Sequence, residues 1–489
     1  MDLRQRRYTE GPLVKTKIIA TVGPACESFE MLRDLAQGGV DLFRLNFAHG
    51  THAWMRDVLA AIRRVSEEAA RPIAVLADLA GPKLRLGKIA DDEILCREGD
   101  RIAFVRGEAS DDPGELTSLY ESLIDDLSPG DLVLLADGTV GLRIVEKSRA
   151  GNRAEAVVEM PGRVRSRQGI NLPGVALSMP SLTPKDRDDL AWAVANEVDY
   201  IGLSFVQSAE DVRELRNAIA EFRSERPPQI VAKIEKMEAV SDLERILAET
   251  DAVMVARGDL GVEVDIARVP ALQKRIIAVC NQHRIPVITA TQMLDSMTVN
   301  ERPTRAEASD VANAVLDGSD AVMLSGETAI GQHPALAVEM MSRIAREAER
   351  LVDAAPSADT HSTARTRATP TTEAVTLAAG VAAAHLEADL LVVATHSGRT
   401  AMAVSKQRGK VPVLAITDRA EIARRMCLYW GITPLESLVA DAEPTRLLKF
   451  VVEWGKKQQA LSVGSRIVLV GTTDWSKEGK DVMLVHAVP

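Results

Sequence analysis

The chain has 489 residues, which is enough for roughly three domains with sizeable cores. Apolar residues make up 46% of it and aromatic residues only 3%, so the cores must consist mainly of Ala, Val, Leu and Ile. The formal net charge of −11 argues against nucleic acid as the main partner.

The sequence shows no sign of secretion or of a membrane anchor. The N-terminus, MDLRQRRYTEG, is basic, but no apolar stretch follows it, so we interpret it as a frayed tail rather than a signal peptide. No apolar run approaches the ~20 residues that span a bilayer. The four cysteines are widely separated and form no Cys-x-x-Cys pair, which fits a reducing compartment without structural zinc. We therefore expect a soluble, cytoplasmic protein that binds neither nucleic acid nor a membrane.

Short apolar runs alternate with helical patterns along most of the first 355 residues. The first run ends at Gly23, and Ser28 can then cap a helix that Gly38 and Gly39 end. Eight such runs, nearly all followed by a polar or glycine cluster, are typical of an α/β fold of the (β/α)8 TIM barrel type and fit it better than an open sheet. The predicted strands are 17–22, 42–47, 73–76, 200–205, 230–234, 252–256, 287–290 and 321–324.

Residues 82–180 interrupt this alternation. Short β-like stretches are broken there by turn signals, such as SPGD at 128–131 and ADG at 136–138. We therefore predict a small all-β domain inserted in a βα loop, on the active-site side, where it can act as a lid. The barrel domain is accordingly divided into 1–81 and 181–355.

The last part of the chain is predicted to form a domain of its own. Residues 356–372 are rich in Ser, Thr, Ala and Pro, which is typical of a linker. Strand–helix alternation then resumes, so 373–489 is predicted to be an open α/β domain. The expected helices are 374–385, 400–407, 422–430 and 447–458, and the expected strands are 390–395, 411–417, 466–470 and 482–488.

Two neighbouring runs of the predicted barrel end in charged residues. Lys233 and Glu235 close one run, and Asp259 follows the next. The carboxyl ends of parallel strands are where α/β proteins place their chemistry. Two carboxylates suit Mg²⁺ or Mn²⁺, because such cations prefer oxygen ligands and take water and phosphate as the others. A lysine beside the metal supplies positive charge for an anion in transfer, and free N–H groups from Gly258 to Gly261 can hold a small carboxylate or phosphate.

A purely structural interpretation is also open at this point. A buried Lys–Glu pair can simply close the end of a strand, and for any single pair that interpretation is favoured. Both runs, however, end in charge on what should be the same face of the barrel. The pattern as a whole therefore favours a site.

Seven motifs of this chain occur together in one enzyme family. They are TKIIATVGPA from residue 16, FRLNFAHGTH from 43, DLAGPKLRLG from 78, KIE from 233, MVARGDLGVE from 254, ATQML from 290 and MLSGETA from 323. One motif alone is a weak signal, but seven in order over essentially the whole chain are specific. The chain resembles the pyruvate kinases, which transfer a phosphoryl group from phosphoenolpyruvate to ADP and then protonate the enolate to pyruvate, the last step of glycolysis.

The resemblance implies a role for each residue of the site. Glu235 and Asp259 resemble the ligands of the divalent ion, and Lys233 resembles the group that lies against the phosphoryl group. By the same resemblance, Arg44 binds the phosphoryl group, and the N–H groups of Gly258 and Asp259 bind the substrate carboxylate. Thr291 is expected to pass a proton to the enolate carbon through water. The residues expected to contact the nucleotide phosphates are Asn46, His49 and Arg85. From the residues alone, structural roles are more frequent at such positions: an ion pair at a strand end for Arg44, a loop cap for His49, and a core or capping side chain for Thr291.

Two positions depart from the pattern of the K⁺-dependent members. Ala48 lacks the serine hydroxyl that is a potassium ligand there, and Lys83 stands where those members have glutamate. An ammonium group is itself a monovalent cation on a flexible stem, and Asp78 and Asn46 are available to receive it. We predict that Lys83 takes the potassium site and that catalysis does not require K⁺. The alternative is a solvated loop lysine.

Other departures concern the nucleotide. Ala80 and Ile330 stand where many members have lysine, and Arg167-Gln168 replaces a pair that contains lysine. The sequence does not indicate which residue takes the role of these missing lysines.

A segment of the last domain has the features of an anion site. Hydroxyl groups, a glycine and free N–H groups at a helix start can bind phosphate, although a plain capping turn is as frequent on spacing alone. The family resemblance implies an allosteric sugar-phosphate or nucleotide effector here, and relatives are usually homotetramers. The predicted effector residues are Thr395, Ser397, Gly398, Arg399 and Thr400, over which Trp475, Lys477 and Lys480 are expected to close.

Two other functions compete with this prediction. The first is lyase or aldolase chemistry on pyruvate enolate, which needs neither Lys233 nor a nucleotide-binding insertion. The second is a catalytically silent effector-binding protein, which predicts the loss of Lys233, Glu235 or Asp259. All three residues are present.

Overall fold

The computed structural model describes residues 14–148, 151–175, 178, 180–354, 369–472 and 481–489. The N-terminal tail and most of the predicted linker 356–372 lie outside the described residues. In the part that is described, no helix has both the length and the apolar character needed to cross a membrane.

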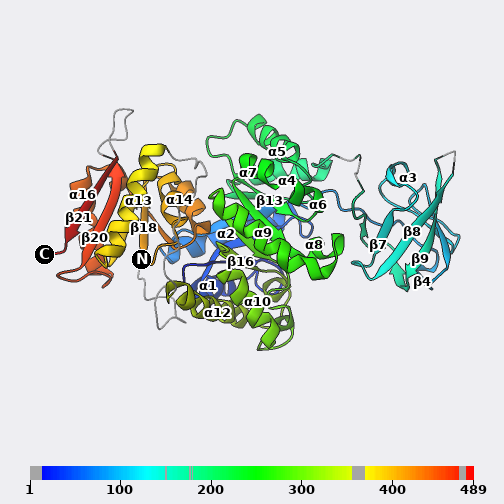
Figure 1. Cartoon of the computed structure of the whole chain (residues 1–489), viewed down its shortest axis with the longest axis horizontal. Helices are drawn as coiled ribbons and strands as arrows, with labels where there is room; N and C mark the ends of the chain where they lie inside the picture. Colours follow the sequence, from blue (N-terminus) through cyan, green and yellow to red (C-terminus); the bar gives the residue numbers. More distant parts are fainter. Residues whose placement is uncertain (1–13, 149–150, 176–177, 179, 355–368, 473–480) are drawn as a thin grey trace.

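Eight parallel strands close into a barrel in the order β1-β16-β15-β14-β13-β12-β3-β2, which lies in the middle of the molecule (Figure 1). The strands are almost entirely buried, because helices cover them outside and side chains fill the barrel inside. The (β/α)8 prediction is therefore confirmed. The strands are β1 (Lys17–Thr21), β2 (Val40–Asn46), β3 (Ala74–Asp78), β12 (Tyr200–Leu203), β13 (Gln229–Ile234), β14 (Ala252–Ala256), β15 (Val287–Ala290) and β16 (Ala321–Leu324).

Helices follow the barrel strands as the sequence pattern indicates. Ser28 caps α1 (Phe29–Gly38), since its hydroxyl oxygen accepts a hydrogen bond from the N–H of Met31 at 3.2 Å, and Gly39 ends the helix with φ 123°. The predicted strand 200–205 is too long, because the backbone turns at Phe205 with φ 55°. Further helices are α2 (His52–Glu68), α4 (Pro184–Ala195), α5 (Ala209–Glu221), α6 (Met237–Ser241), α7 (Leu243–Glu249), α8 (Arg257–Glu263), α9 (Val269–Gln282), α10 (Arg305–Leu316), α11 (Gly326–Ala329) and α12 (Pro334–Ala354).

The segment between β3 and α4 forms a separate β structure at one end of the molecule (Figure 1). A six-stranded sheet, β11-β7-β8-β9-β5-β6, and a two-stranded sheet, β10-β4, enclose an apolar core that includes Phe104 and Leu142. An inserted all-β unit is therefore confirmed, while the boundaries 82 and 180 stay predictions. Its strands are β4 (Glu93–Cys96), β5 (Arg101–Val105), β6 (Glu115–Leu116), β7 (Leu132–Leu135), β8 (Val140–Lys147), β9 (Arg153–Met160), β10 (Gly162–Arg165) and β11 (Ile170–Asn171), and the short helix α3 (Leu123–Asp126) lies between β6 and β7.

The C-terminal part is an open five-stranded sheet in the order β19-β18-β17-β20-β21. The sequence pattern missed the edge strand β19, because Pro434 in the middle of it argues against a strand. An edge strand tolerates proline, since one side of it needs no N–H donor. The pattern also extended the helix at 422–430 too far, since the α-helix ends at Arg425 and a 3-10 turn, Met426–Leu428, follows it. The elements are α13 (Pro370–His385), β17 (Leu390–Ala394), α14 (Arg399–Ser405), β18 (Val413–Thr417), α15 (Ala420–Arg425), β19 (Ile432–Glu436), α16 (Pro444–Lys457), β20 (Arg466–Thr472) and β21 (Asp481–Ala487).

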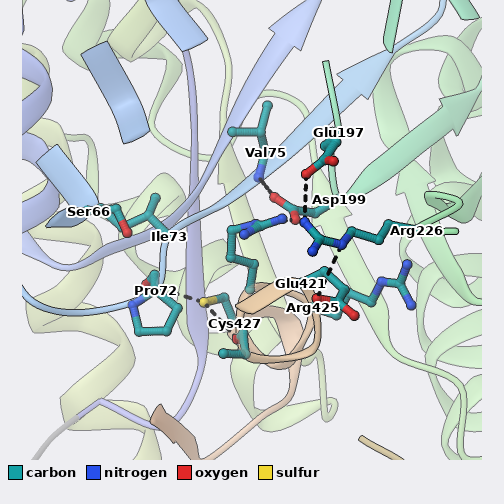
Figure 2. A network of polar contacts seen from close by, with 12 residues as sticks. Ser66, Pro72, Ile73, Val75, Glu197, Asp199, Arg226, Glu421, Arg425 and Cys427 are labelled. Carbon is teal, nitrogen blue, oxygen red and sulfur yellow. Dashed lines mark hydrogen bonds and ion pairs between the residues drawn. The ribbon is translucent and has the colours of Figure 1, made fainter. Parts of the chain in front are cut away.

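Polar contacts fix this sheet domain to the barrel (Figure 2). The buried Asp199, directly before β12, accepts hydrogen bonds from the N–H of Val75 at 2.8 Å and from Nε of Arg424 at 2.7 Å. The thiol of Cys427 lies 3.4 Å from the carbonyl oxygen of Pro72 (Figure 2). These contacts gather at the amino ends of the barrel strands. The carboxyl ends, where the predicted site lies, face the other way.

Candidate active site

Arg44, Asp78 and Lys233 converge because strand residues alternate between the two sides of the barrel wall. Each of them lies two positions after a residue that faces the barrel interior. These preceding residues pack in one apolar cluster: Leu42, Leu76 and Val231. Their sequence neighbours belong to a different cluster, which contacts the helices: Phe43, Val75, Ile230 and Ala232. The three charged residues therefore continue the interior rows and meet at the mouth of the barrel.

The Lys233 ammonium is the centre of the site. Its Nζ lies 2.7 Å from Oγ of Ser204, 2.9 Å from Oε1 of Glu235 and 3.5 Å from Oδ1 of Asp78. The side chain is only 11% exposed. The ammonium is thus fixed on several sides, while a small part of the group stays accessible. Ser204, a strand-end residue without a predicted role, belongs to this network.

The charges of the site shift the pKa values of its members. Burial lowers the pKa of Lys233, but the carboxylates of Asp78 and Glu235 raise it more, so the net shift is upward and the ammonium stays charged at neutral pH. The pKa of Glu235 is raised, first by burial and also by repulsion from Asp259, although Lys233 opposes the shift. A divalent cation between the two carboxylates would remove that repulsion.

Glu235 and Asp259 form a donor set that suits a hard divalent cation. Glu235 is buried, and its Oε2 accepts a hydrogen bond from the N–H of Phe205 at 2.6 Å. Asp259 is partly exposed in the first turn of α8. Among the described residues, no group of three or more His, Cys, Asp or Glu side chains could hold a metal ion. Water and substrate would therefore supply the other ligands, as is common for Mg²⁺.

Arg44 is held by two partners. Its Nε donates to Oδ2 of Asp78 at 2.7 Å, and its Nη1 donates to Oγ1 of Thr21 at 3.2 Å. The strand-end ion pair is thus present, and it also fixes the guanidinium beside Lys233. The other carboxylate oxygen of Asp78, Oδ1, is buried and has no hydrogen-bond partner among the described residues, although Nζ of Lys233 lies 3.5 Å from it.

Thr291 lies on a strained turn next to α8. Thr291 and Gln292 have φ angles of 73° and 53°, which L-residues rarely adopt. A Cβ on Gly258 would lie 2.7 Å from Cγ2 of Thr291, so this close approach requires glycine. Arg257 clamps the turn: its Nη2 donates to the carbonyl oxygen of Thr291 at 2.7 Å, and its Nη1 lies 2.8 Å from Oδ1 of Asp310.

The substitution Arg257→Met is expected to lower kcat by about 10- to 100-fold, because displacement of a catalytic side chain by about 1 Å has effects of this size. The matched control is Arg275→Met, since Arg275 is exposed on α9. Steady-state kinetics with both substrates, on variants with cooperative thermal unfolding, measures the effect. An unchanged kcat in folded Arg257→Met would show that the clamp does not position Thr291.

The predicted nucleotide residues lie on two different segments. Oδ1 of Asn46 accepts a hydrogen bond from the N–H of Ala48 at 3.1 Å, so Asn46 shapes the turn that exposes His49. Arg85 lies on the connection to the inserted unit, where its Nη1 donates to the carbonyl oxygen of Arg167 at 3.3 Å. The sequence pattern missed Lys185 on α4, whose Nζ donates to the carbonyl oxygen of Phe47 in the same turn at 2.7 Å.

The structure does not bring Lys83 to Asp78. Lys83 is exposed and lines a small cavity with Lys236 and Glu263, and within the described ranges no ion pair joins it to Asp78. Arg44 and Lys233 occupy the neighbourhood of Asp78 instead. The role of Lys83 as a substitute for potassium therefore stays a prediction.

The predicted effector segment has the geometry of a capped turn. Oγ1 of the buried Thr395 accepts a hydrogen bond from the N–H of Gly398 at 3.0 Å, and Gly398 adopts φ 80° before α14 begins at Arg399. Nδ1 of His396 lies 2.9 Å from Oδ1 of Asp418. Ser397 lies in the same turn, and Thr400 lies in the first turn of α14. Trp475, Lys477 and Lys480 lie outside the described residues, so their predicted closure over this segment is untested.

Comparison with known proteins decides the family. The family model described as "Pyruvate kinase, barrel domain" matches residues 13–338, and the one described as "Pyruvate kinase, alpha/beta domain" matches residues 373–486. The chain belongs to the pyruvate kinase family. It is therefore a phosphotransferase that forms pyruvate and ATP from phosphoenolpyruvate and ADP, and the predicted family is confirmed.

Individual relatives match the chain over nearly its full length. Pyruvate kinase 2 of Synechocystis sp. is 40% identical over 478 residues, which are 97% of this chain and 79% of the relative. The pyruvate kinase of Geobacillus stearothermophilus is 39% identical over 479 residues, 97% of this chain and 80% of the relative. The crystal structure of a pyruvate kinase from Cryptosporidium parvum superposes with a TM-score of 0.90 at 32% identity, over 98% of this chain and 97% of that one.

Proposed function

We propose that the residues around Lys233 carry out the phosphoryl transfer of this pyruvate kinase. The observation that supports the proposal is the convergence of the Lys233 ammonium and the Arg44 guanidinium with the carboxylates of Asp78 and Glu235. Phosphoryl transfer requires little covalent chemistry from the protein, so catalysis depends mainly on positioning and on charge stabilisation.

In this proposal the phosphoryl group of phosphoenolpyruvate lies against Lys233 and Arg44. Arg44 is held by Asp78 and Thr21, so its planar donors are oriented before the substrate arrives. The carboxylate of the substrate lies at the N–H groups of Gly258 and Asp259, in the first turn of α8, where the helix leaves backbone donors free.

Glu235 and Asp259 would hold Mg²⁺ or Mn²⁺, which supplies positive charge for the phosphoryl and enolate oxygens. Glu235 is fixed by the N–H of Phe205, whereas Asp259 is partly exposed and therefore accessible from solvent. Thr291 lies beside Gly258 and passes a proton through water toward the enolate carbon.

Asn46, His49 and Arg85 contact the nucleotide phosphates, and the inserted unit acts as a lid. Support for the lid comes from its β7–β8 turn, where a Cβ on Gly138 would lie 3.2 Å from Cγ1 of Val262 on α8. On the family resemblance we also propose a cytoplasmic homotetramer. An anionic effector, a sugar phosphate or a nucleotide, binds at the segment from Thr395 to Thr400.

The competing functions find no support in the site. Lyase or aldolase chemistry has no use for Lys233 together with a nucleotide-binding insertion. A silent effector-binding protein is not expected to keep Lys233 paired with Glu235 at 2.9 Å beside Asp259.

The activity is tested by incubating the purified protein with phosphoenolpyruvate, ADP and Mg²⁺ and measuring pyruvate and ATP separately. The expected result is equal amounts of both products and no reaction after chelation of the metal. Pyruvate formed without ATP would favour a different reaction of the enolate. No turnover by the folded protein would contradict the proposed function.

We further propose that Lys83 replaces potassium. Asp78 supports this, because its buried Oδ1 has no hydrogen-bond partner among the described residues and meets Lys233 only through an ion pair at 3.5 Å, so it can accept a hydrogen bond from a second cation. In tetramethylammonium buffer the enzyme is expected to gain at most about twofold from added K⁺, because the lysine ammonium already supplies the monovalent charge.

The substitution Lys83→Met separates this role from that of a solvated lysine. The variant is expected to lose about tenfold or more in activity without K⁺ and to regain part of it when K⁺ is added, since K⁺ can then enter the vacated site. Lys88→Met, an exposed lysine on the same connection, is the matched control. A large activation of the unaltered enzyme by K⁺ would disprove the proposal.

A further inference from the structure

A buried carboxylate on α4 joins three segments near the proposed nucleotide site. Asp189 is 3% exposed, and both of its oxygens are engaged. Oδ1 lies 2.7 Å from Nε2 of His52, at the start of α2, and Oδ2 lies 2.6 Å from Nζ of Lys185, one turn earlier on α4. A carboxylate that loses its water of hydration must find such partners, and here His52 and Lys185 are the partners that take the place of water.

Lys185 extends this connection to the turn after β2. The same Nζ donates to the carbonyl oxygen of Phe47 at 2.7 Å. Phe47 lies between Asn46 and His49, which are the proposed nucleotide residues. The Lys185 ammonium therefore helps to hold the turn from Asn46 to His49 in place, and Asp189 holds the ammonium.

His52 strengthens the connection on the other side of the turn. Its ring stacks on Trp192 with a centroid distance of 5.8 Å and an interplanar angle of 27°. The ring of Phe47 packs edge-on against both, at 6.1 Å from His52 and 5.5 Å from Trp192. Asp189 thus holds two groups that contact Phe47: the Lys185 ammonium, which binds its carbonyl oxygen, and the His52 ring, which packs against its ring. A shift of the turn would disturb these contacts.

We propose that Asp189 is a positioning residue for the nucleotide: it holds Lys185 and His52 so that the turn from Asn46 to His49 keeps the geometry that receives the phosphates of ADP. This inference rests on the proposed placement of the nucleotide at Asn46 and His49. Asp189 itself touches neither substrate. A merely structural carboxylate would stabilise the packing of α4 on α2 without a selective effect on one substrate.

The test is a comparison of Asp189→Asn with Asp188→Asn. The two substitutions remove the same charge from adjacent positions, but Asp188 is exposed. Asp189→Asn is expected to raise KM for ADP about tenfold while KM for phosphoenolpyruvate and kcat at saturating ADP change less than about twofold. Asp188→Asn is expected to match the unaltered enzyme. Equal changes in both KM values, or no change in either, would overturn the inference.

A second variant covers the case in which Asp189→Asn does not fold. His52→Leu keeps an apolar side chain against Trp192 but removes the bond to Asp189 and the ring contacts of His52, at a position whose side chain is 42% exposed. It is expected to raise KM for ADP about three- to fivefold, again without a matching change for phosphoenolpyruvate. A folded His52→Leu variant with unchanged KM for ADP would equally overturn the inference.

A double substitution shows whether Asp189 acts through Lys185. Adding Asp189→Asn to a Lys185→Met enzyme is expected to raise KM for ADP less than about twofold further, because residues of one network are not additive. Full additivity would contradict the connection. Asn46→Ala and His49→Ala test the underlying placement separately: if neither alters KM for ADP, the proposed nucleotide site is wrong, whereas an effect there without one at Asp189 refutes this inference alone.

Discussion

The substitution Lys233→Met is expected to lower the rate of phosphoryl transfer from phosphoenolpyruvate to ADP by about 10³-fold or more, because removal of a fixed charge that faces a transition-state anion has effects of this size. The ammonium is buried and held by Ser204 and Glu235, so the substitution removes a charge whose position is fixed. The second half-reaction, metal-dependent proton exchange at the methyl group of pyruvate, is expected to stay measurable, since it moves no phosphoryl group. Loss of the methyl proton signal of pyruvate in D₂O records that exchange.

The variant must be shown to fold, because Lys233→Met leaves the buried Glu235 without its cation and Asp78 with Arg44 alone, at a cost of about 3–5 kcal/mol. Thermal unfolding of Lys233→Met and of the exposed control Lys88→Met separates instability from lost chemistry. Metal is supplied at saturating concentration so that an altered affinity does not limit the exchange. If transfer and exchange fell by the same factor in the folded variant, the role assigned to Lys233 would be wrong.

The second large effect is expected from the metal ligands. The substitution Glu235→Gln keeps the shape of the side chain but removes one of the two carboxylate charges that face the cation. Apparent affinity for Mn²⁺ is expected to fall about 100-fold or more, because the proposed site offers only two protein ligands. Titration of the enzyme with Mn²⁺, with free metal measured by electron paramagnetic resonance, gives the affinity directly.

Asp259→Asn is expected to behave in the same way, and Glu244→Gln is the matched control, since Glu244 is exposed in the first turn of α7. Activity of the two ligand variants is expected to recover in part at high metal concentration. Unchanged affinity for Mn²⁺ in both folded variants would show that the metal binds elsewhere.

The barrel and the convergence of its charged residues could be predicted from the sequence. The strands are short apolar runs with helical patterns between them, and β13 and β14 end in charge at the same edge of the barrel. The interior position of Lys233 follows from its spacing of two residues after Val231, which is a property of any strand. Local periodicity therefore suffices to predict the barrel fold and the interior position of Lys233.

The remaining features depend on contacts between distant residues, for which the sequence has no local signal. Arg257 clamps the turn at Thr291, 34 residues away, and Asp189 meets His52 across 137 residues. The edge strand β19 was missed because Pro434 is unfavourable in a strand unless one side of it is unpaired. Such features can be predicted only when it is known which elements lie side by side, and that arrangement is defined only in the folded barrel.

The contacts of Lys83 could not be predicted from the sequence motif. Its spacing from Asp78 permits an ion pair, but its stem is flexible, and in the structure its Cε lies near Gly169 on the returning connection of the inserted unit. A long side chain between two segments can adopt more than one position. The spacing alone therefore does not determine which anion it meets.

The central claim is that Lys233 and a metal ion held by Glu235 and Asp259 meet at the mouth of the barrel. Crystals grown with Mn²⁺ and oxalate, a planar dianion shaped like the enolate of pyruvate, test it directly through the anomalous scattering of manganese. The expected peak lies about 2.0–2.3 Å from a carboxylate oxygen of both Glu235 and Asp259, with oxalate completing the coordination and Nζ of Lys233 beside it. A manganese peak that contacts neither carboxylate would contradict the account.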